Sequence, residues 1–229
     1  MKKIGLIGGM SWESTVSYYR AINQGVKARL GGFHSAKIIL YSVDFAEIEH
    51  LQHVGDWHGA GTILIDAAKS LELAGADAFM ICTNTMHNVV DQVQAAVSIP
   101  VLHIADQTAL TLIANNVTKA GLLGTAFTME QAFYRERLEQ HAIEVVIPAE
   151  ESRKDVHRII YQELCLGEIR LESQHRYIDI VDELTALGAQ AVILGCTEIA
   201  LLLNQRLCTV PLYDTTAIHA DAAVDFILS

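Results

Sequence analysis

Short apolar runs alternate along the chain with longer segments in which apolar residues recur every three to four positions. The short runs predict buried strands, and the periodic segments predict helices between them. Strands are expected at residues 3–7, 36–43, 78–81, 100–104, 120–123, 143–147, 191–194 and 211–213. Helices are expected after the first strand, at residues 58–73, from residues 129, 154 and 171, and at the end of the chain. Strands that are apolar throughout and joined by helices indicate parallel sheets, and therefore an α/β fold.

The same pattern occurs twice along the chain. Residues 5–8 match 121–124, residues 73–81 match 186–194, and residues 99–102 match 210–213, at offsets of 116, 113 and 111 residues. Three matches in the same order with a nearly constant offset predict an internal duplication. We therefore expect two pseudosymmetric lobes, each with a parallel sheet flanked by helices, and an active site in the cleft between them.

Composition narrows the class of protein. The 229 residues carry a formal net charge of −11 and are 51% hydrophobic. An acidic chain lacks the basic face with which proteins bind nucleic acid or anionic membranes, and no apolar run reaches the roughly 20 residues of a membrane span. The apolar stretch after Lys3 ends at Ser11, too early for a secretory signal, so we expect a cytoplasmic protein. The four cysteines form no Cys-x-x-Cys pair, which argues against a disulfide framework or a zinc ribbon.

The ends of two matching strands carry the candidate catalytic residues. Extending the second match by two positions aligns Thr83 with Cys196. Ligands of open α/β sheets bind outside the carboxyl ends of the strands, so a pseudo-twofold axis would place these two side chains on opposite sides of one ligand. Inversion at a carbon atom needs such a pair, because one group removes a proton and the other supplies one.

Cys196 is the cysteine whose surroundings suit reactivity. It follows a strand and a glycine and precedes two polar residues at the start of a helix, where backbone N–H groups and the helix dipole favour a thiolate. The alternative is an inert buried cysteine, which is common in protein cores. Cys82, Cys165 and Cys208 lack this context and are expected to be packing residues.

Two polar segments suit a carboxylated ligand. Residues 83–87 (TNTMH) follow a buried run, and residues 8–15 (GGMSWEST) place hydroxyl groups at a helix start, with a counterpart at residues 124–128. N–H groups at helix starts bind anions without a positively charged side chain, and helix capping is the alternative role of these side chains. No dinucleotide fingerprint is present, and His50 and His53 lack a second pair of ligands for a metal.

On these residues the sequence resembles the aspartate/glutamate racemases, cofactor-independent enzymes with two pseudosymmetric α/β lobes. The resemblance extends over essentially the whole chain. It rests on residues 7–14 (IGGMSWES), 83–87, 123–125, 128–129 and 194–198 (LGCTE). The family places one cysteine at each of the two strand ends, one for each face of the substrate α-carbon. The corresponding positions in this chain are Thr83 and Cys196.

Thr83 departs from the family pattern, in which a cysteine is expected. A threonine hydroxyl is a far weaker acid than a thiol, and it is a poor base. The family's second-lobe cysteine acts on the L-enantiomer. The resemblance therefore implies slow turnover and a preference for L-substrate, with Cys196 as the base and Thr83, or a water that it holds, returning the proton. Glu198 stands where dedicated glutamate racemases carry histidine, as in aspartate-type members.

The resemblance also implies the substrate-binding residues, the lobes and the absence of a cofactor. The substrate, a small dicarboxylic amino acid, would contact Met10, Ser11, Gln52, Asn84, Thr85, Thr128, Thr197 and Glu198. The first lobe would contain residues 1–100 and 210–229, and the second residues 101–209. Neither pyridoxal phosphate nor a metal would take part. Homodimers are common in the family, although no residue pattern in this chain establishes one.

The leading hypothesis is an isomerase that interconverts the L- and D-forms of aspartate or glutamate. Cys196 would remove the α-proton, and backbone amides would stabilise the charge that develops on the carboxylate. Two alternatives stay open. One is another single-cysteine enzyme of the same superfamily, such as the arylmalonate decarboxylases, which keep the second-lobe cysteine. The other is a catalytically silent protein that binds a carboxylated ligand.

Overall fold

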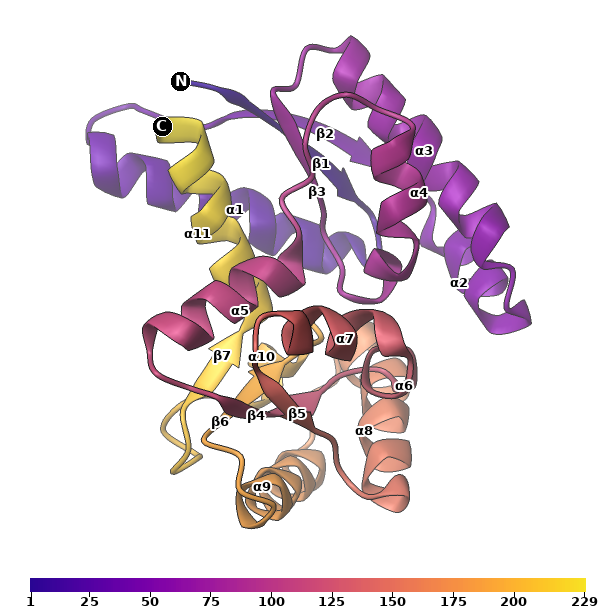
Figure 1. Cartoon of the computed structure of the whole chain (residues 1–229), viewed down its shortest axis with the longest axis vertical. Helices are drawn as coiled ribbons and strands as arrows, with labels where there is room; N and C mark the ends of the chain where they lie inside the picture. Colours follow the sequence, from indigo (N-terminus) through magenta and orange to yellow (C-terminus); the bar gives the residue numbers. More distant parts are fainter. The chain divides into compact units, whose positions relative to one another are not determined.

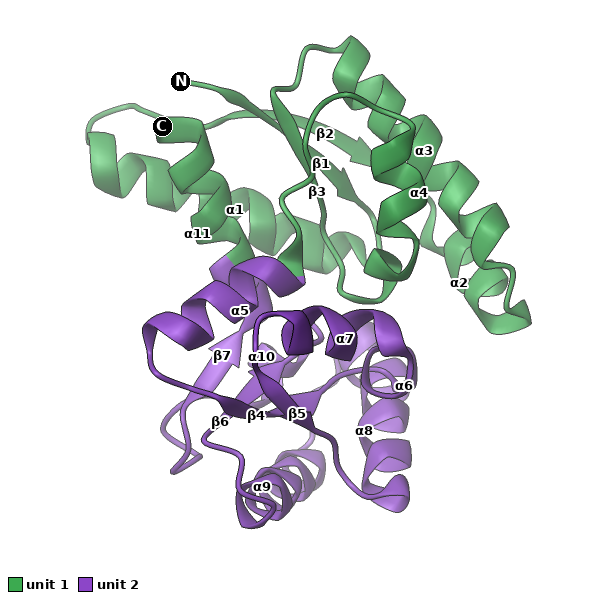
Figure 2. Ribbon diagram, in the orientation of Figure 1, with its two compact units in different colours: residues 1–104, 219–229 green, residues 105–218 purple.

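The computed structural model describes residues 1–229, which form two compact units. Unit 1 contains residues 1–104 and 219–229, and unit 2 contains residues 105–218 (Figure 2). These boundaries differ from the expected ones, which follow residues 100 and 209. The reason for the second difference is that the strand β7 (Leu212–Asp214) pairs with the sheet of unit 2.

Unit 1 is a parallel three-stranded sheet, in the order β2-β1-β3, between two layers of helices (Figure 1). Its elements are β1 (Lys3–Gly8), α1 (Trp12–Leu30), β2 (Lys37–Ser42), α2 (Phe45–Val54), α3 (Trp57–Leu73), β3 (Ala78–Ile81), the short 3-10 helix η1 (Thr85–Val89), α4 (Val90–Ala95) and the greater part of α11 (Thr215–Leu228). The helices α1 and α11 cover one face of the sheet, and α3 and α4 cover the other. The arrangement is the three-layered α/β fold that the alternating pattern predicts.

The burial of the strands explains their composition. Successive side chains of a strand point to opposite faces of the sheet. Ile4 and Leu6 of β1 therefore pack against α1 and α11, whereas Ile7 packs against α3. The part of a strand that is covered on both faces must be apolar, as β3 is and as β1 is after the exposed Lys3. The strand β2 is different from the buried strand expected there, because it lies at the edge of the sheet, and Leu40 is 47% exposed.

Unit 2 repeats this arrangement with a parallel four-stranded sheet in the order β5-β4-β6-β7. Its remaining elements are α5 (Ile104–Ala114), β4 (Lys119–Leu123), α6 (Ala126–Glu130), α7 (Ala132–Gln140), β5 (Glu144–Val146), α8 (Glu150–Gln162), the short 3-10 helix η2 (Leu164–Leu166), α9 (Leu171–Ala186), β6 (Ala191–Leu194) and α10 (Ile199–Leu202). Figure 1 shows α9 on one side of this sheet and α5 and α7 on the other. No helix in either unit has both the length and the apolar character needed to cross a bilayer.

The structure confirms the internal duplication through two matching glutamine side chains. The amide of Gln94 donates to the carbonyl groups three and five residues later and accepts from the N–H seven residues later. Gln205, 111 residues further along, makes the same three contacts. The difference between the two halves is small. The second half completes a strand, β7, at this point, whereas in the first half the expected strand at residues 100–104 is reduced to one bridge between Phe79 and Val101.

The central strands of the two sheets each carry a glycine that packs against a leucine in the same way. A methyl group on Gly5 would lie 2.9 Å from Leu71 Cδ1, and one on Gly121 would lie 2.8 Å from Leu184 Cδ1. We expect Gly5→Ala and Gly121→Ala each to lower the free energy of unfolding by about 1–3 kcal/mol, because extra volume in a packed core forces neighbours to shift. Denaturant titration measures this loss. Adding Leu71→Ala should reduce the cost of Gly5→Ala, because it removes the Leu71 Cδ1 contact, and an unchanged cost in that background would contradict the packing explanation.

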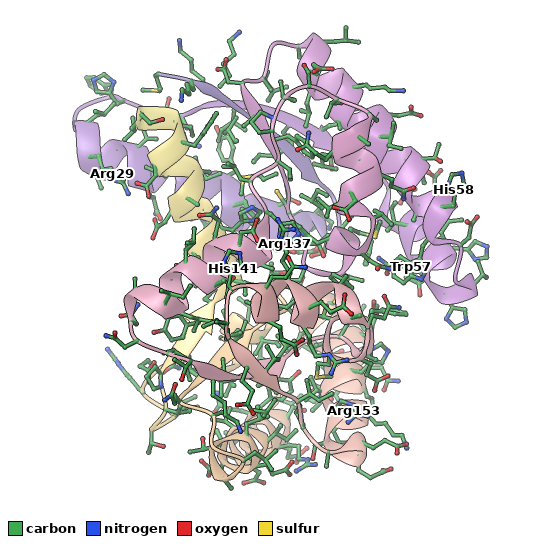
Figure 3. The ribbon with its side chains drawn as sticks, viewed as in Figure 1. Arg29, Trp57, His58, Arg137, His141 and Arg153 are labelled. Carbon is green, nitrogen blue, oxygen red and sulfur yellow. The ribbon has the colours of Figure 1, made fainter.

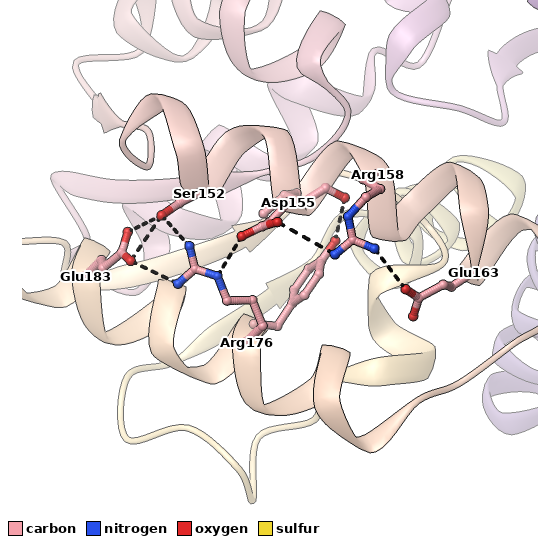
Figure 4. A network of polar contacts seen from close by, with 8 residues as sticks. Ser152, Asp155, Arg158, Glu163, Arg176 and Glu183 are labelled. Carbon is pink, nitrogen blue, oxygen red and sulfur yellow. Dashed lines mark hydrogen bonds and ion pairs between the residues drawn. The ribbon is translucent and has the colours of Figure 1, made fainter.

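Ion pairs connect the helices of unit 2. Arg137 of α7 donates to both carboxylate oxygens of Asp106 at 2.6 and 2.7 Å, and His141 lies 3.1 Å from the same carboxylate (Figure 3). A second network joins α8 to α9 (Figure 4), and it consists of Ser152, Asp155, Arg158, Glu163, Arg176 and Glu183. Because several charges share partners, such a network stabilises the helix pair more than an isolated surface pair would.

Candidate active site

In unit 1 the candidate residues lie at the carboxyl edge of the sheet. Met10 and Ser11 follow β1, and residues 83–85 follow β3. These two strands are adjacent and parallel, so both loops leave the sheet at the same edge. Gln52, on the helix after β2, joins them because its Nε2 donates to Met86 Sδ at 3.0 Å. The structure therefore brings together the six expected residues of unit 1 in one region.

The loop after β1 has the glycine turn and the helix cap that the sequence predicts. Gly9 has a φ of +96°, and a methyl group there would lie 2.3 Å from the carbonyl oxygen of Val43. Ser11 caps α1, with its Oγ 2.8 Å from Ser14 Oγ and accepting weakly from the Ser14 N–H at 3.4 Å. Capping is therefore one role of Ser11, and it orients the start of α1 toward the carboxyl edge of the sheet.

The segment after β3 is largely buried, with Thr83 as its more exposed member. Asn84 and Thr85 are buried, whereas Thr83 is partly exposed. Asn84 begins η1 without a capping hydrogen bond from its side chain, so capping does not explain this residue. The carbonyl oxygen of Thr83 lies 2.8 Å from Nδ1 of His87. The strand end is thus held by a side chain four residues later.

In unit 2 the matching strand end carries Cys196, and the residue before it, Gly195, packs against Thr128. The Gly195 N–H donates to the carbonyl oxygen of Leu123 at 2.6 Å, which extends the pairing of β6 with β4 by one residue. A methyl group on Gly195 would lie 2.8 Å from that oxygen and 3.4 Å from Thr128 Cγ2. Only glycine fits this position, and the close approach places Thr128 against the residue that precedes the candidate catalytic cysteine.

Thr125 and Thr128 form the counterpart of the Ser11 cap. Thr125 caps α6, its Oγ1 accepting from the Thr128 N–H at 3.3 Å and lying 3.3 Å from Thr128 Oγ1. The same pair of contacts joins Ser11 and Ser14, 114 residues earlier. The duplication therefore includes the loops of the candidate site as well as the sheets.

The Cys196 side chain faces a carboxylate. Its Sγ donates to Glu198 Oε2 at 3.0 Å, and Thr197 Oγ1 donates to the same oxygen at 2.7 Å. Burial, and then the negative charge of Glu198, raise the pKa of the Cys196 thiol well above its usual range. The backbone N–H of Glu198 acts in the direction expected from the sequence, toward a thiolate, but burial and the carboxylate of Glu198 outweigh it. The helix that follows, α10, is only four residues long and begins three residues after Cys196.

The other cysteines have different surroundings. Cys82 is fully buried in the core between the sheet of unit 1 and α1, and burial raises its pKa. It therefore packs, as the sequence predicts. Cys165 lies on η2 and is partly exposed. Cys208 is partly exposed, and burial raises its pKa as well.

Two histidines at the candidate site carry contacts that sequence reasoning missed. His157 of α8 accepts the Ala126 N–H at 3.1 Å, so this amide at the start of α6 already has a partner within the protein. Burial lowers the pKa of His157, which favours the neutral form that this contact needs. His87 binds the Thr83 carbonyl. Its place at the end of the 83–87 segment was the available signal for His87, whereas nothing in the sequence marked His157.

Comparison with known proteins adds four findings. A family model described as "Asp/Glu/Hydantoin racemase" matches residues 7–223. The structure superposes on a candidate Asp/Glu racemase from Yersinia pestis with a TM-score of 0.95, at 58% identity over 100% of both chains. It superposes on an aspartate racemase homologue from Pyrococcus horikoshii OT3 with a TM-score of 0.88, at 36% identity over 100% of both chains. The broad specificity amino-acid racemase RacX of Bacillus subtilis (strain 168) is 28% identical over 72% of this chain and 71% of RacX.

Proposed function

Because the chain belongs to the Asp/Glu/hydantoin racemase family, we propose that it racemises aspartate or glutamate without a cofactor. The observation that carries this proposal is the Cys196 thiol, held against Glu198 at the carboxyl end of β6. The internal duplication matches this position to Thr83 at the end of β3. Two matched strand ends with different side chains suit a reaction that treats the two faces of one carbon differently.

In the proposed mechanism Glu198 prepares Cys196. The thiol is protonated at rest, because burial and the neighbouring carboxylate raise its pKa. Glu198 Oε2 already accepts the S–H hydrogen bond at 3.0 Å and takes this proton, leaving a thiolate. The thiolate then removes the α-proton of the L-substrate and becomes a thiol again. This reassigns Glu198, which was expected to bind substrate, to the activation of the cysteine.

Reprotonation from the opposite face completes the inversion. The carbanion takes a proton from the Thr83 hydroxyl, or from a water held by it, and the resulting alkoxide or hydroxide recovers a proton from solvent. Glu198 releases the proton that it took from the Cys196 thiol to solvent, which restores the starting state. Ser11 and Thr128, at the two matched helix starts, are proposed to bind the carboxylates of the substrate together with nearby backbone N–H groups. Met10, Gln52, Asn84, Thr85 and Thr197 complete the proposed substrate contacts.

Because Thr83 and Cys196 differ as acids and bases, we expect a preference for L-substrate. It can appear in the rate of α-proton exchange but not in kcat/KM for inversion. L- and D-aspartate have equal free energies in water, so kcat/KM for inversion must be equal in the two directions. Exchange of the α-proton with solvent has no such constraint. Cys196, once Glu198 has deprotonated it, can remove and return the proton of the L-form without Thr83, whereas exchange of the D-form requires a threonine alkoxide, which is rarely populated.

We therefore expect the α-proton of L-aspartate or L-glutamate to exchange with D₂O at least about ten times faster than that of the D-enantiomer. Proton NMR follows exchange, and chiral chromatography of the same samples follows inversion. Inversion should be slower than exchange from the L-form. Equal exchange rates for the two enantiomers would contradict the asymmetric mechanism.

The same experiment separates racemisation from the alternatives. Exchange from the L-form without any D-product would mean that Thr83 does not return the proton. No exchange from either enantiomer of either amino acid would refute the racemase proposal. In that case release of carbon dioxide from an arylmalonate would favour a decarboxylase, and binding of a dicarboxylate without any reaction would favour a silent binding protein.

A further inference from the structure

Three buried histidines and a tyrosine form a cluster in unit 1 that the proposed mechanism does not use. The cluster consists of Tyr18 on α1, His87 on η1, His103 directly before α5, and His219 on α11, and each is at most 6% exposed. The ring centres of His87 and His103 are 4.6 Å apart, and those of His87 and His219 are 6.0 Å apart. Buried imidazoles must satisfy their nitrogens internally, so their contacts define their protonation.

The contacts of His87 define its tautomer. The backbone N–H of Ile104 can only donate, and it points at His87 Nε2 at 3.3 Å. This nitrogen must therefore be the acceptor, and the imidazole proton resides on Nδ1. The Nδ1–H then donates to the carbonyl oxygen of Thr83 at 2.8 Å. A neutral imidazole with its proton on Nδ1 satisfies both contacts, whereas a protonated one would lose the bond from Ile104.

His219 holds the same segment in the opposite tautomer. The Leu102 carbonyl can only accept, so His219 Nε2–H donates to it at 2.7 Å, and Nδ1 accepts from the Tyr18 hydroxyl at 3.1 Å. Burial lowers the pKa of His219 to about 3, which keeps this ring neutral. The segment that holds Ile104 in place for His87 is thereby itself anchored to α1.

The matched position in unit 2 shows what His87 adds. There the carbonyl of Cys196 accepts from the backbone N–H of Ile199 at 3.1 Å, and Ala200 stands where the duplication places His87. In unit 1 an imidazole takes over the task of binding the matching carbonyl. The His87 backbone N–H also donates to the Asn84 carbonyl at 3.0 Å. One residue thus holds two successive peptide groups after β3.

We propose that His87 is a positioning residue for Thr83, acting as the neutral imidazole with its proton on Nδ1. Because the peptide group is planar, fixing the Thr83 carbonyl fixes the backbone rotation that directs the Thr83 side chain and the Asn84 N–H. This inference rests on the proposed function, in which Thr83 or its water returns the proton. A weak acid on a partly exposed loop contributes little unless it is held in the productive geometry.

Two variants separate the two hydrogen bonds of His87. In His87→Asn the side-chain amide reaches the place of Nδ1 and can still donate to the Thr83 carbonyl. In His87→Gln the amide reaches the place of Nε2 and can still accept from Ile104. We expect His87→Gln to lower the rate of inversion by about tenfold or more while exchange of the L-form α-proton, which needs Cys196 and Glu198 but not Thr83, stays within about twofold of wild type. His87→Asn should keep both rates near those of the wild type.

The ratio of inversion to exchange is the deciding measurement, with thermal unfolding of both variants recorded alongside. A merely structural role would lower inversion and exchange together, and would overturn the proposal. Equal ratios in both variants, or a lower ratio in His87→Asn alone, would overturn it as well. Nitrogen-15 NMR of histidine-labelled wild-type protein tests the tautomer independently of activity, and a proton on Nε2 of His87 would refute it. If the wild type exchanges no α-proton at all, the proposed function fails, whatever tautomer is found.

Discussion

Replacing Cys196 with serine is expected to lower both α-proton exchange of the L-substrate and inversion by about 10²–10⁴-fold, the range over which a positioned acid or base accelerates proton transfer. A serine hydroxyl has nearly the shape of the thiol, but its acidity is far too low to supply a base at neutral pH. Glu198 cannot compensate, because it reaches the sulfur position and not the substrate carbon in the proposed mechanism. Proton NMR in D₂O measures exchange, and chiral chromatography measures inversion.

A measurement of substrate binding and a second cysteine variant serve as controls for this experiment. Calorimetric titration of Cys196→Ser with L-aspartate and L-glutamate should show affinity close to the wild-type KM, because the thiol is not a substrate-binding group in the proposal. Cys208→Ser is the matched control, since this partly exposed cysteine lies outside the site, and its activity should be unchanged. Exchange that survives in Cys196→Ser at the wild-type rate would assign the base to another residue and refute the mechanism.

The second large effect is expected for Glu198→Gln. This substitution should make the Cys196 thiol more acidic and yet make the enzyme slower at pH 7. Removing the carboxylate removes a negative charge 3.0 Å from Sγ, so the pKa of Cys196 should fall. The rate at pH 7 should nevertheless fall by about 10–10²-fold, because the thiol loses the acceptor for its proton. Raising the pH should narrow this loss, since hydroxide in the solvent then deprotonates the thiol directly.

Alkylation of the thiol as a function of pH measures the pKa, and the pH dependence of exchange measures activity. In the wild type the thiolate fraction rises with pH toward the raised pKa, so alkylation should increase on the alkaline side, and the midpoint in Glu198→Gln should lie at lower pH. Glu150→Gln is a control for a surface carboxylate, because Glu150 is exposed and pairs with Lys154. A faster Glu198→Gln at pH 7 would show that Glu198 only restrains the thiol and does not accept its proton.

The hydrophobic pattern predicted the architecture of both units. Runs that are apolar at every position, such as residues 78–81 and 191–194, are strands covered on both faces, and the structure has both at those residues. The pattern was less informative at the edges. Residues 37–42 form an exposed edge strand, and residues 100–104 contain only one bridge. Whether a segment at the edge of a sheet forms a strand depends on which neighbouring strands pair with it, and an apolar run does not specify those neighbours.

Only part of the candidate site could be predicted from the sequence. Glycines with no room for a side chain, hydroxyls that cap helices and the cysteine after β6 all have local sequence signals, and the duplication pairs them across the chain. The roles of Thr83, Cys196 and the proposed substrate contacts stay predictions, because they depend on a bound substrate. Glu198 and Cys196 are only two positions apart in the chain, yet the sequence does not say which way either side chain turns.

By itself, the sequence determined the α/β class, the duplication, the places of the buried strands and the family, because burial periodicity and short motifs are local properties of the chain. The tertiary structure alone decided the protonation of Cys196 and the tautomers of His87 and His219. A pKa depends on burial and on the charges that folding brings near, and a tautomer depends on its hydrogen-bond partners. For His219 these partners are Tyr18 and Leu102, which lie 201 and 117 residues away in the chain.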